Sequence, residues 1–214
     1  MRISLLCSDE QHPVNEYLHS WIVKQKSAHE IEIVRKKRDL SGGDILFLIS
    51  CSEIVSAADR SAYRASLVLH ASDLPKGRGW SPYIWDIIGG AEEITLSLLE
   101  AEDKVDSGRI WQKVRFPIPK DALWDEINKR LFCAEIELID FAVREFSSIM
   151  PVEQDISIEP TYYPRRLPSD SQIDPSQSIA SQFDRIRVCD PQRFPAFFEL
   201  HGKKYKIVLE KFNG

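Results

Sequence analysis

The 214-residue chain has few of the features that mark secreted and membrane proteins. Its four cysteines, Cys7, Cys51, Cys133 and Cys189, are scattered without paired spacing, which argues against disulfides and against a zinc site. The apolar runs are all far shorter than a membrane span, and the first residues enter a strand pattern directly. We therefore expect neither a signal peptide nor a transmembrane helix, and we expect a cytoplasmic protein with reduced thiols.

Positive charge is also scarce. The 28 Lys and Arg residues are outnumbered by 33 Asp and Glu residues, and the net charge of -5 offers no basic field to tRNA or DNA. No His, Cys and carboxylate residues cluster at the spacing of metal ligands, so we expect no metal site. The composition, 43% apolar and 29% charged, is that of an ordinary globular protein. The length suits one domain, with or without a small appendage.

Short apolar runs alternate with helical patterns along the first 90 residues. Strands are expected at residues 3–7, 30–34, 44–49 and 67–69, and helices at 15–25, 57–63 and 82–88. This β-α-β-β-α-β succession with continuous apolar strands predicts an α/β fold. We expect a Rossmann-like, mostly parallel sheet with helices on both faces.

The second half of the chain changes in character. Strands at 94–99 and 110–116 flank an acidic loop, and a helix follows from residue 121 to about 149, with one apolar face for core packing. Residues 150–178 are rich in Pro, Ser and Asp and predict an extended connector. A short helix at 179–186 and a hairpin of 194–198 with 204–209 complete the chain. We expect a main domain over 1–150 and an extension over 151–214 that packs on it or on a partner chain.

The stretch from Leu69 to Pro82 is the most informative part of the sequence. His70 closes an apolar strand and opens a loop that holds Gly, Pro, Lys and Arg, and Asp106 lies 36 residues later in a second loop after another strand. Open α/β sheets carry their chemistry at the carboxyl ends of strands. The pair therefore predicts a transfer or hydrolysis site, although a lone histidine is more often packed or solvated.

The glycine-containing loop Lys76-Gly77-Arg78-Gly79 lacks the spacing of a P-loop or a dinucleotide fingerprint. Its backbone N–H groups and two cations still suit a phosphate. A plain mobile loop is the alternative interpretation.

These residues resemble the folate-dependent formyltransferases, the family of methionyl-tRNA formyltransferase and glycinamide ribonucleotide formyltransferase. The resemblance rests on His70, Ser72-Asp73-Leu74-Pro75, Gly79, Pro82 and Asp106-Ser107-Gly108, and it covers residues 3–119. The wording His-x-Ser-Asp-Leu-Pro-x-Gly-x-Gly-Trp-Ser-Pro and the tail from Tyr163 to Phe198 look like the sugar N-formyltransferase branch. Enzymes of that branch formylate amino sugars carried on nucleotides, as in the pseudaminic-acid and O-antigen (lipopolysaccharide) pathways.

The resemblance implies a transferase that uses 10-formyltetrahydrofolate as co-substrate. The sugar amine would attack the formyl carbon, and His70 would donate to the resulting oxyanion or shuttle its proton to the folate nitrogen. Asp106 would orient and charge-stabilise the imidazole. The implied acceptor is a UDP-linked 4-amino sugar of the pseudaminic-acid pathway, or else a GDP- or dTDP-linked 4-amino-4,6-dideoxy sugar. The branch also implies a homodimer, formed through the 121–149 helix and the tail.

The binding residues follow from the same resemblance. Folate is expected against Ser50, Cys51, Ser52, Ile54, Val55, Glu102, Lys104 and Val105. The nucleotide sugar is expected against Lys76, Arg78, Gly79, Trp80, Tyr162, Tyr163, Arg165 and Arg166. Ordinary core packing is the alternative for Ile54 and Val55, and solvated charges or packing between elements for the substrate residues.

One position departs from the family pattern. The family's Asn, two residues before the histidine, falls at Val68, which cannot donate a hydrogen bond. Losing an oxyanion donor costs about a hundred- to thousandfold in rate, so we expect another donor to compensate. Three alternatives stay open. The first is a non-catalytic binding protein on this fold, which Val68 supports. The second is tRNA formylation, which the acidic net charge disfavours. The third is glycinamide ribonucleotide formylation, which the sequence motif of the loop disfavours.

Overall fold

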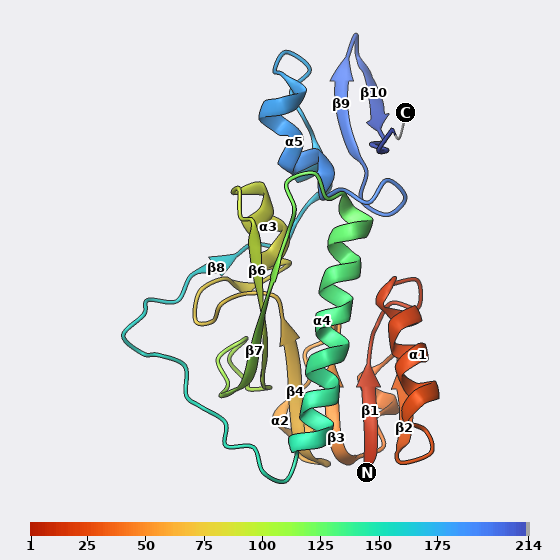
Figure 1. Ribbon diagram of the computed structural model, residues 1–214, viewed down its shortest axis with the longest axis vertical. Coiled ribbons are helices and arrows are strands. Elements are labelled where there is room, and N and C mark those ends of the chain that lie inside the picture. Colours follow the sequence, from red (N-terminus) through yellow and green to blue (C-terminus); the bar gives the residue numbers. More distant parts are fainter. Residues whose placement is uncertain (213–214) are drawn as a thin grey trace.

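The computed structural model describes residues 1–212, which form a six-stranded sheet with helices against it (Figure 1). The strand order is β2-β1-β3-β4-β6-β7, parallel up to β4 and antiparallel from β4 onward. The expected mostly parallel α/β sheet is therefore confirmed, with a hairpin at one edge. The strands are β1 (Arg2–Leu6), β2 (Glu30–Val34), β3 (Gly43–Leu48), β4 (Tyr63–His70), β6 (Glu93–Glu100) and β7 (Ile110–Pro117).

The two faces of the sheet are covered unequally. Ile3 and Leu5 of β1 join the main core beneath the long helices, whereas Leu6 joins a smaller cluster on the opposite face. That second face is covered by the segment that carries the short α2. The helices are α1 (Val14–Gln25), α2 (Ala57–Arg60), α3 (Pro82–Ile88), α4 (Trp124–Glu145) and α5 (Ile179–Arg187), with 3-10 turns η1 (Lys37–Asp39) and η2 (Pro168–Ser171).

Two helices are shorter than the sequence predicts. The helix expected at 57–63 ends at Arg60, because Tyr63 already pairs with β3 in the sheet. The helix expected from 121 to about 149 runs from Trp124 to Glu145, and the carboxylate of Glu126 caps its start by accepting the Leu123 N–H. Within residues 1–212 no helix is long and apolar enough to cross a membrane.

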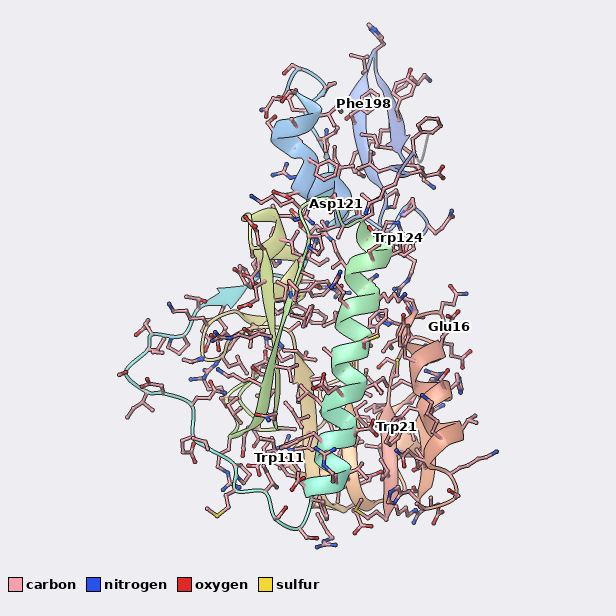
Figure 2. The ribbon with its side chains drawn as sticks, viewed as in Figure 1. Glu16, Trp21, Trp111, Asp121, Trp124 and Phe198 are labelled. Carbon is pink, nitrogen blue, oxygen red and sulfur yellow. The ribbon has the colours of Figure 1, made fainter. Side chains whose placement is uncertain are left out.

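Helix α4 is held between two tryptophans (Figure 2). Trp21 of α1 donates its indole N–H to Asp140 Oδ1 at 2.6 Å, and the Trp111 ring of β7 lies 6.3 Å from the ring of Phe146, just after α4. Both indoles are almost fully buried, and rings of this size contribute much of a core's stability. The buried face of α4 is therefore fixed over the sheet.

The connector after α4 is more ordered than its composition suggests. It runs outside the β7 edge of the sheet (Figure 1) and forms a bridge between Val152 and Ile110. Further on, β8 (Tyr162–Tyr163) pairs in parallel with β5 (Arg78–Gly79), in the loop after His70. Gly79 has a φ of +99°, and a Cβ there would lie 2.5 Å from Tyr163 O. Only glycine allows this approach.

The C-terminal extension lies beyond the N-terminal end of α4 (Figure 1). Its hairpin consists of β9 (Ala196–Leu200) and β10 (Lys203–Ile207), slightly shifted from the predicted strands because Phe194 closes a turn onto Asp190 O. Ala196 is buried against the main core, and Phe198 stacks on Tyr205 at 5.2 Å. The extension therefore packs on the main domain in part, while Leu200, Tyr205 and Val208 stay exposed.

Candidate active site

The two residues expected to carry the chemistry lie together at the carboxyl end of β4. Leu67 and Leu69 point into the main core, so His70 and Val68, at alternate positions, face the other side of the sheet. His70 Nδ1 lies 3.5 Å from Asp106 Oδ1, and the two side chains are 8% and 7% exposed. The two side chains are therefore close enough to form an ion pair whenever the imidazole carries a charge.

Backbone groups of the loop after β4 orient both side chains. His70 Nε2 lies 2.8 Å from Gly77 O, and a carbonyl only accepts, so we assign a proton to Nε2. Asp106 Oδ2 accepts the Gly79 N–H at 2.9 Å. Asp106 itself has a φ of +52°, which an aspartate adopts more readily than most residues. The Asp106 loop and the His70 loop are thus joined directly.

Gln154, in the connector, is a site residue that the sequence did not reveal. Its Nε2 donates to the carbonyls of Asp106 and Gly108, both at 2.9 Å, and its Oε1 accepts from Arg78 Nη2 at 2.6 Å. Gln154 is 8% exposed and Arg78 is 5% exposed. A single glutamine in a polar connector carries no pattern from which this contact could be predicted.

The two segments expected to bind folate lie side by side. Arg60 Nη1 donates to Val55 O, and its Nη2 contacts Asp103 Oδ1, both at 2.7 Å, so one guanidinium joins the loop after β3 to the loop after β6. Ile54 and Val105 are 83% and 57% exposed. Ser50, Cys51, Ser52 and the buried Val55 lie on the first loop, and Glu102 and Lys104 on the second.

The residues expected to bind the substrate separate into two groups. Lys76, Trp80, Tyr162 and Arg165 are exposed, and the Arg165 guanidinium lies 5.0 Å above the Trp80 ring. Gly79, Arg78, Tyr163 and Arg166 are at least partly buried and have partners in the protein. Tyr163 donates to Asp86 Oδ1, and Arg166 donates to Ser171 Oγ. Burial, together with this bond to Asp86, raises the pKa of Tyr163 to about 12.

A second polar cluster lies on the α4 side of the sheet, near the carboxyl end of β1. Glu135 interrupts the apolar face of α4, and its Oε2 has no hydrogen-bond partner among residues 1–212. Burial raises the pKa of Glu135 to about 8. Burial and the nearby Arg193 lower the pKa of His12 to about 4, and His12 Nε2 lies 3.2 Å from Ser50 Oγ. In the sequence, this cluster could have been found from Glu135, an acidic residue on the otherwise apolar face of the helix.

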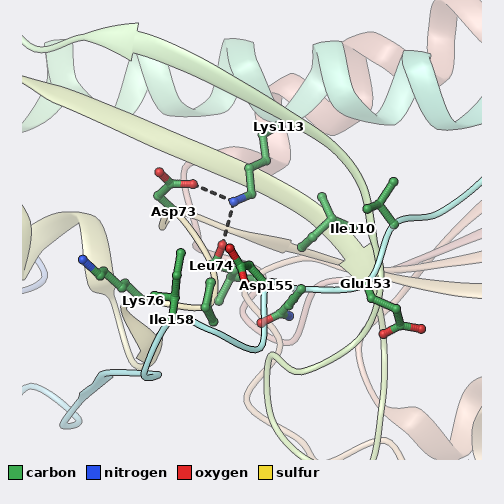
Figure 3. Close-up of a pocket in the computed structure, with 11 residues that line it drawn as sticks. Asp73, Leu74, Lys76, Ile110, Lys113, Glu153, Asp155 and Ile158 are labelled. Atoms are coloured by element: carbon green, nitrogen blue, oxygen red, sulfur yellow. Dashed lines mark hydrogen bonds and ion pairs between the residues drawn. The ribbon is translucent and has the colours of Figure 1, made fainter.

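A cavity of about 390 Å³ lies beside the Asp73–Lys76 segment, under the connector (Figure 3). Lys113 of β7 lines it and contacts Asp73 Oδ1 and Leu74 O, each at 2.6 Å. Ile110 and Ile158 contribute apolar walls. Gln154 also lines this cavity. The cavity therefore lies next to the hydrogen-bond network that holds Asp106.

The chain is similar to known proteins in sequence and in fold. The methionyl-tRNA formyltransferase of Sorangium cellulosum is 29% identical over 172 residues, which cover 78% of this chain and 54% of that protein. The chain spans about half the length of the curated relatives that it matches. In three dimensions it is similar to methionyl-tRNA formyltransferase from Clostridium thermocellum, with a TM-score of 0.81, 20% identity and 97% of each chain covered.

Two further solved structures share the fold. A sugar N-formyltransferase from Shewanella sp. has a TM-score of 0.75 at 12% identity, with 100% of this chain and 99% of that chain covered. HypX from Aquifex aeolicus, solved in complex with tetrahydrofolic acid, also has a TM-score of 0.75, at 20% identity, with 95% and 36% covered. The family model described as formyl transferase matches residues 4–143, which include both His70 and Asp106. The chain therefore belongs to the formyl transferase family.

Proposed function

We propose that this protein is an N-formyltransferase that moves the formyl group of 10-formyltetrahydrofolate to the amino group of a nucleotide-linked amino sugar. The observation that carries the proposal is the buried His70–Asp106 pair at the carboxyl end of β4. When bound, 10-formyltetrahydrofolate supplies the formyl group to be transferred. The Ser50–Val55 and Glu102–Val105 segments hold it, with Ile54 and Val105 as apolar contacts for its ring.

In this proposal His70 and Asp106 donate and accept the protons that move during formyl transfer. Asp106 orients the imidazole and, when Nδ1 also carries a proton, stabilises the positive charge at 3.5 Å. His70 donates a hydrogen bond to the formyl oxygen as that oxygen gains charge, which requires its Nε2–H to exchange Gly77 O for the formyl oxygen. Asp106 accepts the proton that the attacking amine loses, directly or through water, and this proton is passed to the leaving folate nitrogen as the bond between that nitrogen and the formyl carbon breaks. The low exposure of both side chains keeps water from weakening this interaction.

The acceptor is a nucleotide sugar in this proposal. The exposed Trp80 face with Arg165 above it suits a base and a phosphate, and Lys76 adds a second exposed cation. The sequence motifs of the loop after His70 and of the tail support a UDP-linked 4-amino sugar of the pseudaminic-acid type as the acceptor. GDP- and dTDP-linked 4-amino-4,6-dideoxy sugars are the second choice.

Methionyl-tRNA formylation is the second candidate, because the curated relatives carry that name. A net charge of -5 disfavours it, since tRNA binding depends on Lys and Arg at the phosphates.

An experiment with a panel of acceptors distinguishes the two candidate functions. The protein is incubated with 10-formyltetrahydrofolate and UDP-, GDP- and dTDP-linked 4-amino sugars or methionyl-tRNA, and products are weighed by mass spectrometry. We expect a gain of one formyl group on a nucleotide sugar. Formylation of the tRNA alone, or folate binding without any transfer, would overturn the proposal.

We further propose a cytoplasmic homodimer, with residues 1–150 as the catalytic domain and 151–214 as an extension at the dimer contact. Leu200, Tyr205 and Val208, on or beside the hairpin, are exposed apolar side chains that a second copy would cover in this arrangement. Four free cysteines support a reducing compartment. Light scattering over a dilution series tests the assembly: we expect twice the chain mass, and a strict monomer at micromolar concentration would refute it.

A further inference from the structure

Residues 152–163, which we call the strap, are tied to three parts of the catalytic region. Val152 exchanges two backbone hydrogen bonds with Ile110, at 2.7 and 2.9 Å. At the other end, Thr161 Oγ1 accepts the Gly77 N–H at 2.8 Å, and Thr161 O accepts the Arg78 N–H at 2.9 Å. The strap therefore spans from the edge strand β7 to the loop that contacts His70.

Gln154 is the contact between the strap and the Asp106 loop. Both of its amide protons are used on the carbonyls of Asp106 and Gly108, which lie on either side of Ser107. These two bonds fix the backbone at the position where Asp106 takes a positive φ. Because the carboxylate of Asp106 follows its backbone, Gln154 controls where that carboxylate points.

Arg78 completes a connection between the two catalytic loops. Its guanidinium is turned inward, with Nη2 on Gln154 Oε1 at 2.6 Å and Nη1 on the Tyr162 hydroxyl at 3.3 Å. Arg78 directly follows Gly77, whose carbonyl contacts His70 Nε2. A series of hydrogen bonds therefore connects the loop after His70, through the side chains of Arg78 and Gln154, to the backbone of Asp106.

We propose that Gln154 is a positioning residue for formyl transfer and that, together with Arg78, it sets the separation of His70 and Asp106. Arg78 is then a structural cation in place of the phosphate ligand that the sequence suggested. This inference rests on the proposed function, and it adds a residue outside the segment matched by the family model, which ends at residue 143.

Three substitutions test the proposal. Gln154→Leu removes all three hydrogen bonds, Gln154→Glu keeps the contact with Arg78 but cannot donate to the two carbonyls, and Arg78→Met removes the cation. Gln177→Leu, at an exposed glutamine in the same connector, is the matched control. For each variant kcat and both KM values are measured, together with thermal unfolding and amide hydrogen exchange over residues 102–109.

We expect kcat to fall by about a hundredfold in all three variants, because small misplacements of a catalytic group cost about that much. KM for the nucleotide sugar should stay within about threefold, and exchange over 102–109 should be faster in both Gln154 variants. The control should match the wild type. Gln154→Glu keeps the size of the side chain and carries the test if Gln154→Leu does not fold.

Several outcomes would overturn the inference. A raised KM for the nucleotide sugar with unchanged kcat in Arg78→Met would make Arg78 a phosphate ligand. Full activity in Gln154→Glu would mean that the two carbonyl bonds do not matter. If the wild type transfers formyl to no acceptor, the proposed function fails by itself. Hydrogen exchange then still decides the positioning role, and unchanged exchange over 102–109 would refute it.

Discussion

Replacing Asp106 by Asn removes one negative charge from the site and preserves the size of the side chain. The amide oxygen can still accept the Gly79 N–H, and its NH2 group then faces His70 Nδ1. An NH2 donor favours a bare Nδ1 and offers no negative charge to stabilise a second proton on the imidazole during transfer. The perturbation is therefore to the charge and protonation of His70, with little change in packing.

The expected size follows from the observed distance. Two unit charges 3.5 Å apart attract by about 5 kcal/mol at an effective dielectric constant of about 20. If about 3 kcal/mol of this acts only in the transition state, kcat falls by about 10² to 10³, since 1.4 kcal/mol corresponds to about tenfold. His70→Ala should reduce kcat by at least as much, because it removes the proton donor itself.

The assay is release of tetrahydrofolate under saturating nucleotide sugar, with thermal unfolding recorded alongside. Asp39→Asn, at an exposed aspartate in η1, is the matched control and should retain wild-type kcat. A kcat within threefold of wild type for Asp106→Asn, in a protein that melts normally, would refute the catalytic role of this pair.

Three further predictions concern neighbouring groups. Arg60→Ala should raise KM for 10-formyltetrahydrofolate about tenfold with kcat nearly unchanged, because it separates the two folate segments; an unchanged KM would argue against that site. Burial raises the pKa of Glu135 from 4.5 to about 8, so the folded protein keeps a proton that the unfolded chain releases, and the free energy of unfolding falls as pH rises from 4.5 to 8. Glu135→Gln should therefore raise the melting temperature at pH 8 and not at pH 4, and equal shifts at both would contradict this. Val68→Asn tests whether another donor replaces the family's Asn: kcat should rise if no other donor compensates, while a drop would indicate a pocket built around the apolar row that Val68 shares with Leu48 and Leu99.

The sequence predicts those parts of the fold whose signals are local. The strand at 30–34 and the helix at 82–88 are found at their predicted bounds, because apolar alternation and a proline at the helix start are visible within a few residues. His70 and Asp106 could be placed near each other because both follow strands of one sheet. Their separation, and the backbone groups that orient them, could not.

Contacts between distant segments account for most of what was missed. Strand β8 has two residues and no periodicity, so its pairing with β5 is invisible in the sequence. The sequence predicts Arg78 as a substrate-binding cation and gives no sign of its contact with Gln154, which lies 76 residues away. Glu135 belongs to no motif of the sequence, although a carboxylate among the buried positions of an apolar helical face is itself a signal.

The strap also sets the order in which a competent enzyme can form. The bonds from Gly77 to Thr161 and from Arg78 to Gln154 close loops of 84 and 76 residues, whereas β6 and β7 are joined by a short hairpin loop. Long closures cost more chain entropy and form late. During synthesis the main sheet is complete once β7 has emerged, but Gln154 is made only after the whole of α4. A chain interrupted near residue 149 would thus contain every strand of the main sheet and lack the residues that fix Asp106, so catalysis would report that synthesis has passed the strap.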